Sequence, residues 1–344
     1  MNRAKKLFFR ITTPFSPIIG EKKLQTWLNN RLILPLYHAV SFESPSHLKY
    51  LYRIKNEAQF KLDIEALLKL AQPVGLAEII EHSKNNEFFK MPVFHISFDD
   101  GLREFYDVAA PILHEKGIPA TCFLNNAFID NKDIFFRFKS SILIEKLHKA
   151  RTGSEEWKIF HEWVKKNKFP EGYYRKTLKS IRYDKRSLID DLAADMGVDF
   201  RDYLKKEKPY MTSDQIKDLV NKGFTIGAHS LDRPDYSKLS EEEQLQQTQM
   251  SVDDICTRFN LNYRVFSFPF TDDGIKTSLF YKLQKDNITD LTFGCAGMKK
   301  DSIKTNYQRI PVEIYQETIP GILKKEQMYN KLLKLFGKDK IIRE

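Results

Sequence analysis

The amino-acid sequence predicts an α/β fold, specifically a deformed (β/α)7 barrel with a helical insertion. Seven short runs rich in apolar or β-branched residues alternate with stretches whose apolar residues recur at helical spacing. Strands that alternate with helices favour parallel pairing. Polar side chains stand directly after several of the runs. In barrels of this type the functional residues lie at the carboxyl ends of the strands, so these side chains are candidates for a common site.

The expected strands lie near residues 32–38, 93–98, 120–124, 224–228, 264–269, 290–294 and 308–312. Helical spacing is clear over residues 58–68 and resumes after Ser240, a helix cap followed by three glutamates. Seven strands fit an incomplete relative of the eight-stranded barrel.

Residues 131–210 interrupt this alternation. The stretch is rich in lysine and aromatic residues, and its spacing is helical. We interpret it as a helical insertion between the third and fourth strands. Its aromatic side chains are expected to pack against one another, with stacking on a sugar as the alternative.

The chain carries a formal net charge of +10, and this charge is unevenly distributed. Residues 1–31 hold seven basic side chains against one acidic, residues 145–188 hold thirteen against six, and residues 321–344 hold seven against three. We therefore expect a barrel over residues 32–320, preceded by a basic segment and followed by a basic helix or tail. A solvated surface is one explanation for these charges, and attraction to an anionic membrane or glycan is another. No nucleic-acid-binding motif accompanies them.

The composition is that of a globular protein. The 344 residues are 42% apolar and 30% charged, and no run of about 18 apolar residues predicts a membrane-spanning helix. The start of the chain lacks the pattern of a secretory signal, so a cytoplasmic location is the expectation. Cys122, Cys256 and Cys295 lie far apart in apolar settings, which predicts core residues and neither a disulfide framework nor a zinc knuckle.

The most informative motif is the apolar run that ends at Asp99, Asp100 and Gly101. Successive side chains of a strand point to opposite faces, so two adjacent carboxylates end the apolar pattern. Gly101 then permits a tight turn. Paired carboxylates at a strand end can divide the work of holding a cation and taking a proton. A simple strand-terminating turn with a helix cap is the alternative.

Residues 97–101 (Ser-Phe-Asp-Asp-Gly) resemble the first motif of the polysaccharide deacetylases, carbohydrate esterases of the chitooligosaccharide-deacetylase type. Residues 37–40 resemble the tyrosine-histidine motif of one branch, and residues 117–123 the strand after the first helix. Residues 226–234 are similar to the histidine motif, and residues 266–270 to the proline-aromatic motif. The resemblance spans about residues 32–315 and favours the surface-polysaccharide biosynthesis type. It implies the same deformed barrel.

The resemblance also implies roles for individual residues. Asp99 would be the general base, Asp100 and His229 would bind a divalent metal, and His38 would be the acid that protonates the leaving amine. The metal implied is zinc, with cobalt, manganese or nickel as alternatives. A bound metal would polarise the carbonyl and activate a water molecule.

The third ligand of the family pattern is a histidine four residues after His229, and here that position is Arg233. A guanidinium cannot coordinate a metal, and its charge repels one. Three alternatives follow: Asp232 or Asp235 supplies the missing ligand, the metal is bound by two residues and water, or the site has lost its metal and Arg233 pairs with Asp100.

The closing part of the sequence adds further candidates. Phe270 matches the residue whose backbone N–H helps to hold the oxyanion, and Arg233 and Asp273 join it as candidates for substrate binding, although Asp273 also suits a turn. Ser267 stands where many members carry the arginine that orients the base. Arg309 is interpreted as a structural ion-pair partner, with reach to the site as the alternative.

Two hypotheses follow. The first is a metal-dependent hydrolase that removes acetyl groups, mainly N-acetyl, from a glycan or lipid-linked sugar of cell-surface polysaccharide synthesis, at the inner membrane face. The second is a catalytically silent, deacetylase-like glycan-binding or scaffold protein, which Arg233 favours. The expected partner is an acetylated glycan or glycolipid, with peripheral contact to an anionic membrane.

Overall fold

The computed structural model describes residues 3–14, 19–29, 31–170, 172–313 and 317–344. A parallel sheet forms its centre, with strands in the order β11-β9-β8-β7-β6-β5-β2-β12. These strands are β2 (Pro35–Tyr37), β5 (Ile96–Phe98), β6 (Ala120–Leu124), β7 (Thr225–Ala228), β8 (Val265–Ser267), β9 (Leu291–Gly294), β11 (Asn306–Gln308) and β12 (Ile310–Pro311). The expected α/β barrel is confirmed.

The last strand of the barrel, which spans residues 306–311, nearly closes the sheet. Its first half, β11, pairs with β9, and its second half, β12, pairs with β2. The two halves meet at Arg309, whose backbone N–H donates to the carbonyl of Gly294. The strand expected at residues 308–312 is therefore divided at this arginine, which is held between the two edges of the barrel.

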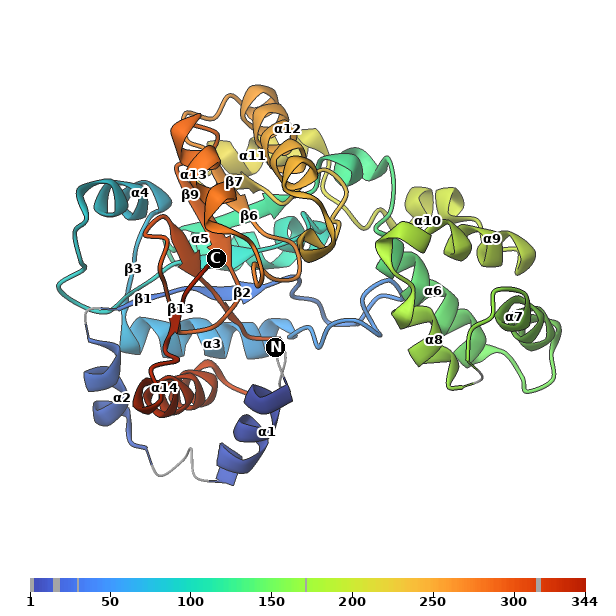
Figure 1. Ribbon diagram of the computed structural model, residues 1–344, viewed down its shortest axis with the longest axis horizontal. Helices are drawn as coiled ribbons and strands as arrows, with labels where there is room; N and C mark the ends of the chain where they lie inside the picture. The colour runs from blue at the N-terminus through green and yellow to red at the C-terminus, as the bar shows by residue number, and fades with distance from the viewer. Residues whose placement is uncertain (1–2, 15–18, 30, 171, 314–316) are drawn as a thin grey trace.

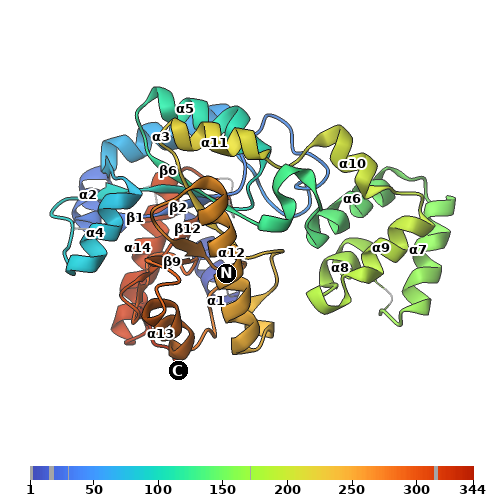
Figure 2. The ribbon, with the colours of Figure 1, turned by 90° about the horizontal axis from the view of Figure 1, so that it is seen from above.

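Helices surround the sheet (Figures 1 and 2). The outer helices are α3 (Glu57–Leu70), α4 (Leu76–Asn85), the π-helical η2 (Phe105–Ala109), α5 (Ala110–Glu115), α11 (Ser213–Asn221), α12 (Glu241–Phe259) and α13 (Thr277–Lys285). Ser240 accepts from the backbone N–H of Glu243 in a reciprocal capping box, as its sequence predicts. Short 3-10 turns occur at η3 (Asn126–Asn131), η4 (Tyr183–Lys185) and η5 (Tyr236–Lys238).

Two small parallel sheets extend the barrel. One joins β1 (Leu32–Ile33), β4 (Val93–Phe94) and β3 (Gln72–Pro73), and the other joins β10 (Lys300–Asp301) and β13 (Lys340–Ile341). The second sheet ties the end of the chain to the barrel.

The expected insertion is a separate group of helices that projects to one side of the barrel (Figure 2). It contains α6 (Phe136–Lys149), α7 (Glu155–Lys166), α8 (Tyr174–Ser180), α9 (Ser187–Asp195) and α10 (Phe200–Glu207). Most of its aromatic residues pack in its own apolar core, together with Phe135 and Tyr210 at its two ends. Packing therefore accounts for these aromatics, apart from the largely exposed Tyr173.

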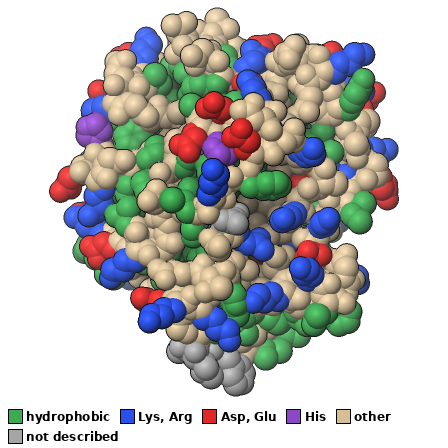
Figure 3. All heavy atoms as spheres, turned by 90° about the vertical axis from the view of Figure 1, so that its left-hand side faces the viewer, with side chains coloured by type: hydrophobic (Ala, Val, Ile, Leu, Met, Phe, Trp, Pro, Cys, Tyr) green, Lys and Arg blue, Asp and Glu red, His purple; other side chains and the backbone are tan. Residues whose placement is uncertain are grey.

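The basic ends of the chain form a third layer, which we call the terminal layer. It comprises α1 (Arg3–Thr12), α2 (Glu21–Leu28) and α14 (Ile319–Leu335), with the segment that follows α14. The three helices lie together below the barrel in Figure 1, and α14 also contacts α3. Figure 3 views the molecule from the left of Figure 1 and shows lysine and arginine side chains gathered over the lower half of that face.

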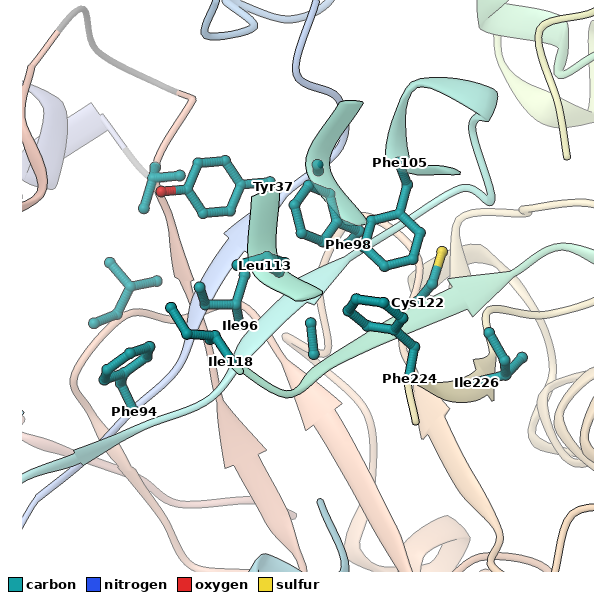
Figure 4. Packing of buried hydrophobic residues seen from close by; sticks show 14 of the residues in the cluster. Tyr37, Phe94, Ile96, Phe98, Phe105, Leu113, Ile118, Cys122, Phe224 and Ile226 are labelled. Atoms are coloured by element: carbon teal, nitrogen blue, oxygen red, sulfur yellow. The ribbon is translucent and has the colours of Figure 1, made fainter. Parts of the chain in front are cut away.

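The main core lies between the barrel strands and their helices (Figure 4). Phe98 stacks on Tyr37 with ring centroids 5.4 Å apart and contacts Phe105 on the other side. His95 is also buried, and it bonds the Val74 carbonyl and the Thr121 hydroxyl. These contacts fix the strand β5 whose carboxyl end carries Asp99 and Asp100.

Candidate active site

Four predicted site residues follow strand ends of the same sheet. His38 follows β2, Asp99 and Asp100 follow β5, and His229 follows β7. Because the strands are parallel, their carboxyl ends meet at one side of the barrel. The structure thus brings together the residues that the sequence places at separate strand ends.

Gly101 is required at the turn after the carboxylate pair. Its φ is +66°, and a Cβ at this position would lie 2.9 Å from Cδ2 of Leu124. Three further site residues, Asp100, Arg233 and Phe270, also adopt positive φ. Left-handed backbone is unfavourable for side chains as large as arginine and phenylalanine, and such conformations cluster at functional sites.

Asp99 is bound by Arg309. The guanidinium is bidentate, with Nη1 2.7 Å from Oδ1 and Nη2 2.9 Å from Oδ2, and both residues are buried. Burial alone would raise the pKa of Asp99, but the adjacent Arg309 holds the pKa of this carboxyl well below its usual range. Arg309 therefore supplies the guanidinium missing at Ser267, whose hydroxyl accepts from Arg309 as well.

Asp100 is bound by Arg233. Nη1 of Arg233 lies 2.8 Å from Oδ2 of Asp100 and 2.8 Å from the Tyr52 hydroxyl. The guanidinium is also held against the rings of Phe135 and Phe270, at 4.5 and 5.3 Å from the ring centroids. Arg233 is buried and firmly positioned, so the position of the expected third ligand is occupied by a fixed positive charge.

His229 faces both carboxylates. Its Nδ1–H donates to the Ser267 carbonyl at 2.8 Å, and burial lowers the pKa of His229 to about 4, so the ring is neutral near pH 7. Nε2 then carries a lone pair, 3.7 Å from Oδ1 of Asp100 and 3.8 Å from Oδ2 of Asp99.

Two buried acceptors in this group, Asp100 Oδ1 and His229 Nε2, lack a hydrogen-bond partner among the described residues. Facing acceptors with no donor between them suit a cation, and carboxylate oxygen and imidazole nitrogen are ordinary zinc ligands. In the described part of the chain, however, no three His, Cys, Asp or Glu side chains form a metal-binding group. The pair fits a divalent cation with two protein ligands, one fewer than a catalytic zinc site generally has.

The proposed substitutes for the third ligand lie elsewhere. The Asp232 carboxylate bonds the Tyr183 hydroxyl and the Gln247 amide, and Asp235 caps the short turn at Ser237. Neither carboxylate has a contact with Asp100 or His229 among the described residues. This alternative is not supported by the geometry.

His38 is held by Glu313, which follows β12. Nδ1–H of His38 donates to the Glu313 carboxylate at 2.7 Å, and the ring stacks on Tyr52 at 3.9 Å. Burial favours the neutral ring, but the charge of Glu313 outweighs it and raises the pKa of His38. His38 therefore keeps its proton to a higher pH than a free imidazole does.

A cavity of about 840 Å³ opens at this end of the barrel. Its lining includes Asp99, His38, Arg233, Phe270 and the exposed Asp273, but not Asp100 or His229. Its walls also include residues from the insertion and from the terminal layer. Asp99 and His38, the candidate base and acid, thus line the cavity, whereas the candidate ligand pair lies outside its lining.

Several contacts of the site escaped the sequence analysis. Tyr52 has no motif around it, and Glu313 follows a strand end as His38 does, which is the signal that was available. Arg309 forms an ion pair with Asp99 and also lines the cavity, so it is both the ion-pair partner and the residue that reaches the site, which the sequence had offered as alternatives. Cys295 was expected in the core, but it is half-buried and lines the cavity, where its thiol contacts the Phe270 carbonyl.

The fold and the site define a class of protein: a parallel barrel with a buried Asp-Asp-His group at the carboxyl ends of its strands. The sequence model described as polysaccharide deacetylase matches residues 89–286. The chain therefore belongs to the polysaccharide deacetylase family, hydrolases that act on carbon-nitrogen bonds other than peptide bonds. No protein of curated function matches the sequence.

Solved structures share the fold. The deacetylase PplD of Streptococcus pyogenes, in complex with acetate, is 16% identical with a TM-score of 0.53, and the match covers 86% of this chain and 97% of that one. IcaB from Ammonifex degensii is 15% identical, with the same TM-score and coverage. A de-N-acetylase from Aggregatibacter actinomycetemcomitans is 13% identical with a TM-score of 0.50, covering 85% of this chain and 99% of that one.

Proposed function

We propose that this protein removes N-acetyl groups from an amino sugar of a glycan or lipid-linked intermediate in cell-surface polysaccharide synthesis, at the cytoplasmic membrane face. The observation that carries the proposal is the arrangement of Asp99 and His38 around one cavity, each held by its own charged partner. Deacetylation needs a base that takes a proton from water and an acid that gives one to the leaving amine.

Asp99 is the proposed base. Its bidentate contact with Arg309 fixes the carboxylate and keeps it ionised. His38 is the proposed acid, because the Glu313 carboxylate raises the pKa of its ring and so favours the protonated form. Phe270 lines the cavity and has a positive φ, and its backbone N–H is the proposed donor to the oxyanion. Asp273 and Arg233 are the proposed contacts to sugar hydroxyl or carbonyl groups.

Asp100 and His229 are the proposed ligands of a divalent metal, with zinc as the first choice. When bound, the metal would supply Lewis-acid polarisation of the acetyl carbonyl and a more acidic water. The ion pair between Arg233 and Asp100 competes for the same carboxylate. We therefore expect weaker metal binding than in a site with three protein ligands.

The same ion pair favours a second candidate, a catalytically silent glycan-binding protein. The two are separated by incubating the protein with N-acetylglucosamine oligomers and zinc, and measuring both acetate release and binding. Acetate release supports the deacetylase. Binding without acetate release at any metal concentration supports the silent protein and overturns the first proposal.

The acid role of His38 predicts a pH profile. Glu313→Gln removes the charge that raises the pKa of His38, so the pKa should fall, and His38 would lose its proton at a lower pH. We expect the alkaline limb of the kcat/KM profile to move to lower pH by about one unit or more. An unchanged limb would assign the acid to another group.

A further inference from the structure

We propose that the terminal layer is a docking surface for an anionic lipid bilayer. The layer consists of α1, α2, α14 and the segment that follows α14. Docking through these helices would not require the deacetylation reaction.

The layer is a packed unit that also borders the cavity. Phe8 and Phe9 of α1 contact the Tyr329 ring of α14 at 5.2 and 6.4 Å between ring centroids. Lys331 of α14 lies 3.7 Å from the centroid of Trp27, which belongs to α2. Phe9 and Tyr329 line the cavity that contains Asp99. Helices α1 and α14 therefore contribute both to the terminal layer and to the wall of the cavity.

α1 has an outward apolar face. Phe9 and Thr12 point into the molecule, whereas Leu7 and Ile11, four residues apart on the opposite side, are 60% and 58% exposed. Lys6, also exposed, stands next to them. The outward side of a helix on a globular protein is generally polar. A helix that lies on a bilayer instead has an apolar outward side flanked by basic residues.

The last ten or so residues of the chain also combine exposed apolar side chains with exposed lysines. Leu335, Phe336 and Ile342 are 82%, 68% and 82% exposed. They are interspersed with the exposed basic residues Lys334, Lys338 and Lys340. Exposed apolar side chains among basic ones match the acyl boundary and the phosphate groups of an anionic bilayer, respectively.

The basic side chains of the layer are largely without counter-charges. Among the described residues, no carboxylate lies within ion-pair distance of those at positions 6, 10, 22, 23, 331, 334, 338 and 340. Lys331 is crowded by like charge, since burial and then Lys23 and Arg31 lower its pKa. An anionic surface would relieve this repulsion.

A bilayer fits this surface better than a second copy of the chain, because two copies would bring like charges together. None of the helices among the described residues is long and apolar enough to span a membrane. The geometry therefore points to docking on the surface. A lipid-linked sugar held in that bilayer would lie beside the layer that borders the cavity.

The test is sedimentation of the full chain with vesicles of phosphatidylcholine, with and without phosphatidylglycerol. We expect binding to the anionic vesicles alone, and a loss in the variant L7D/I11D. Each neutralised lysine is expected to lower the partition coefficient about fivefold, so K331Q/K334Q should lower it about 25-fold. The matched control is K165Q/K166Q on α7, a pair of exposed lysines in the other basic region, and it should bind normally.

Absence of binding to anionic vesicles would overturn the proposal, and so would an equal loss in K165Q/K166Q. A dimer in light scattering that L7D/I11D dissociates would assign the surface to a second copy instead. Melting temperature and hydrolysis of a water-soluble N-acetylated oligomer report whether each variant is folded. Because that hydrolysis needs no vesicle, failed docking with intact hydrolysis overturns this inference alone.

Discussion

Replacing Asp99 with asparagine is expected to lower deacetylation on the order of 10²- to 10⁴-fold, the range observed when a general base is removed. The amide cannot accept the proton of the attacking water. It also leaves the buried Arg309 guanidinium without its counter-charge. Breaking one side of a buried ion pair costs roughly 3–5 kcal/mol, so the melting temperature should fall as well.

A second variant separates the loss of the base from the loss of stability. Asp63→Asn breaks the buried contact of Asp63 with Lys55, and neither residue lines the cavity that contains Asp99. It should reduce stability while kcat per folded molecule stays close to that of the wild type. If Asp63→Asn and Asp99→Asn reduce kcat equally, Asp99 acts through stability and is not the base.

Arg233→His is expected to raise zinc affinity by at least about tenfold. The change removes the guanidinium from Oδ2 of Asp100 and places an imidazole at the position of the third family ligand. Titration calorimetry of the metal-free protein measures this affinity directly.

Arg233→Gln is the matched control, because it removes the charge and adds no zinc ligand of comparable strength. We expect it to bind zinc better than the wild type and less well than Arg233→His. If the wild type binds zinc as tightly as Arg233→His, the ion pair does not compete with the metal. If neither variant binds zinc, Asp100 and His229 are not metal ligands.

The sequence was sufficient to predict that the candidate site residues meet at one end of the barrel, because the signals were local. Asp99 and His229 each end an apolar run, and parallel strands bring such ends together. The insertion was also predictable from its helical spacing and its aromatic residues. These features depend on neighbours within a few positions along the chain.

The partners of those residues were harder to predict, because they depend on tertiary register. Arg309 meets Asp99 across 210 positions of sequence, and Glu313 meets His38 across 275. Both contacts exist because the last strand of the barrel pairs with β9 before Arg309 and with β2 after it. Nothing in the local pattern specifies that change, so the sequence named Arg309 as a candidate, and only the fold showed that its guanidinium takes the place of the one missing at Ser267.

The most direct test of the account is acetate release by wild-type protein that has been stripped with a chelator and then titrated with zinc. We predict no release from the stripped protein and recovery as zinc is added, with half-recovery at a higher zinc concentration than Arg233→His requires. Full activity of the stripped protein would contradict the role assigned to Asp100 and His229. The absence of acetate release at every zinc concentration would contradict the deacetylase itself.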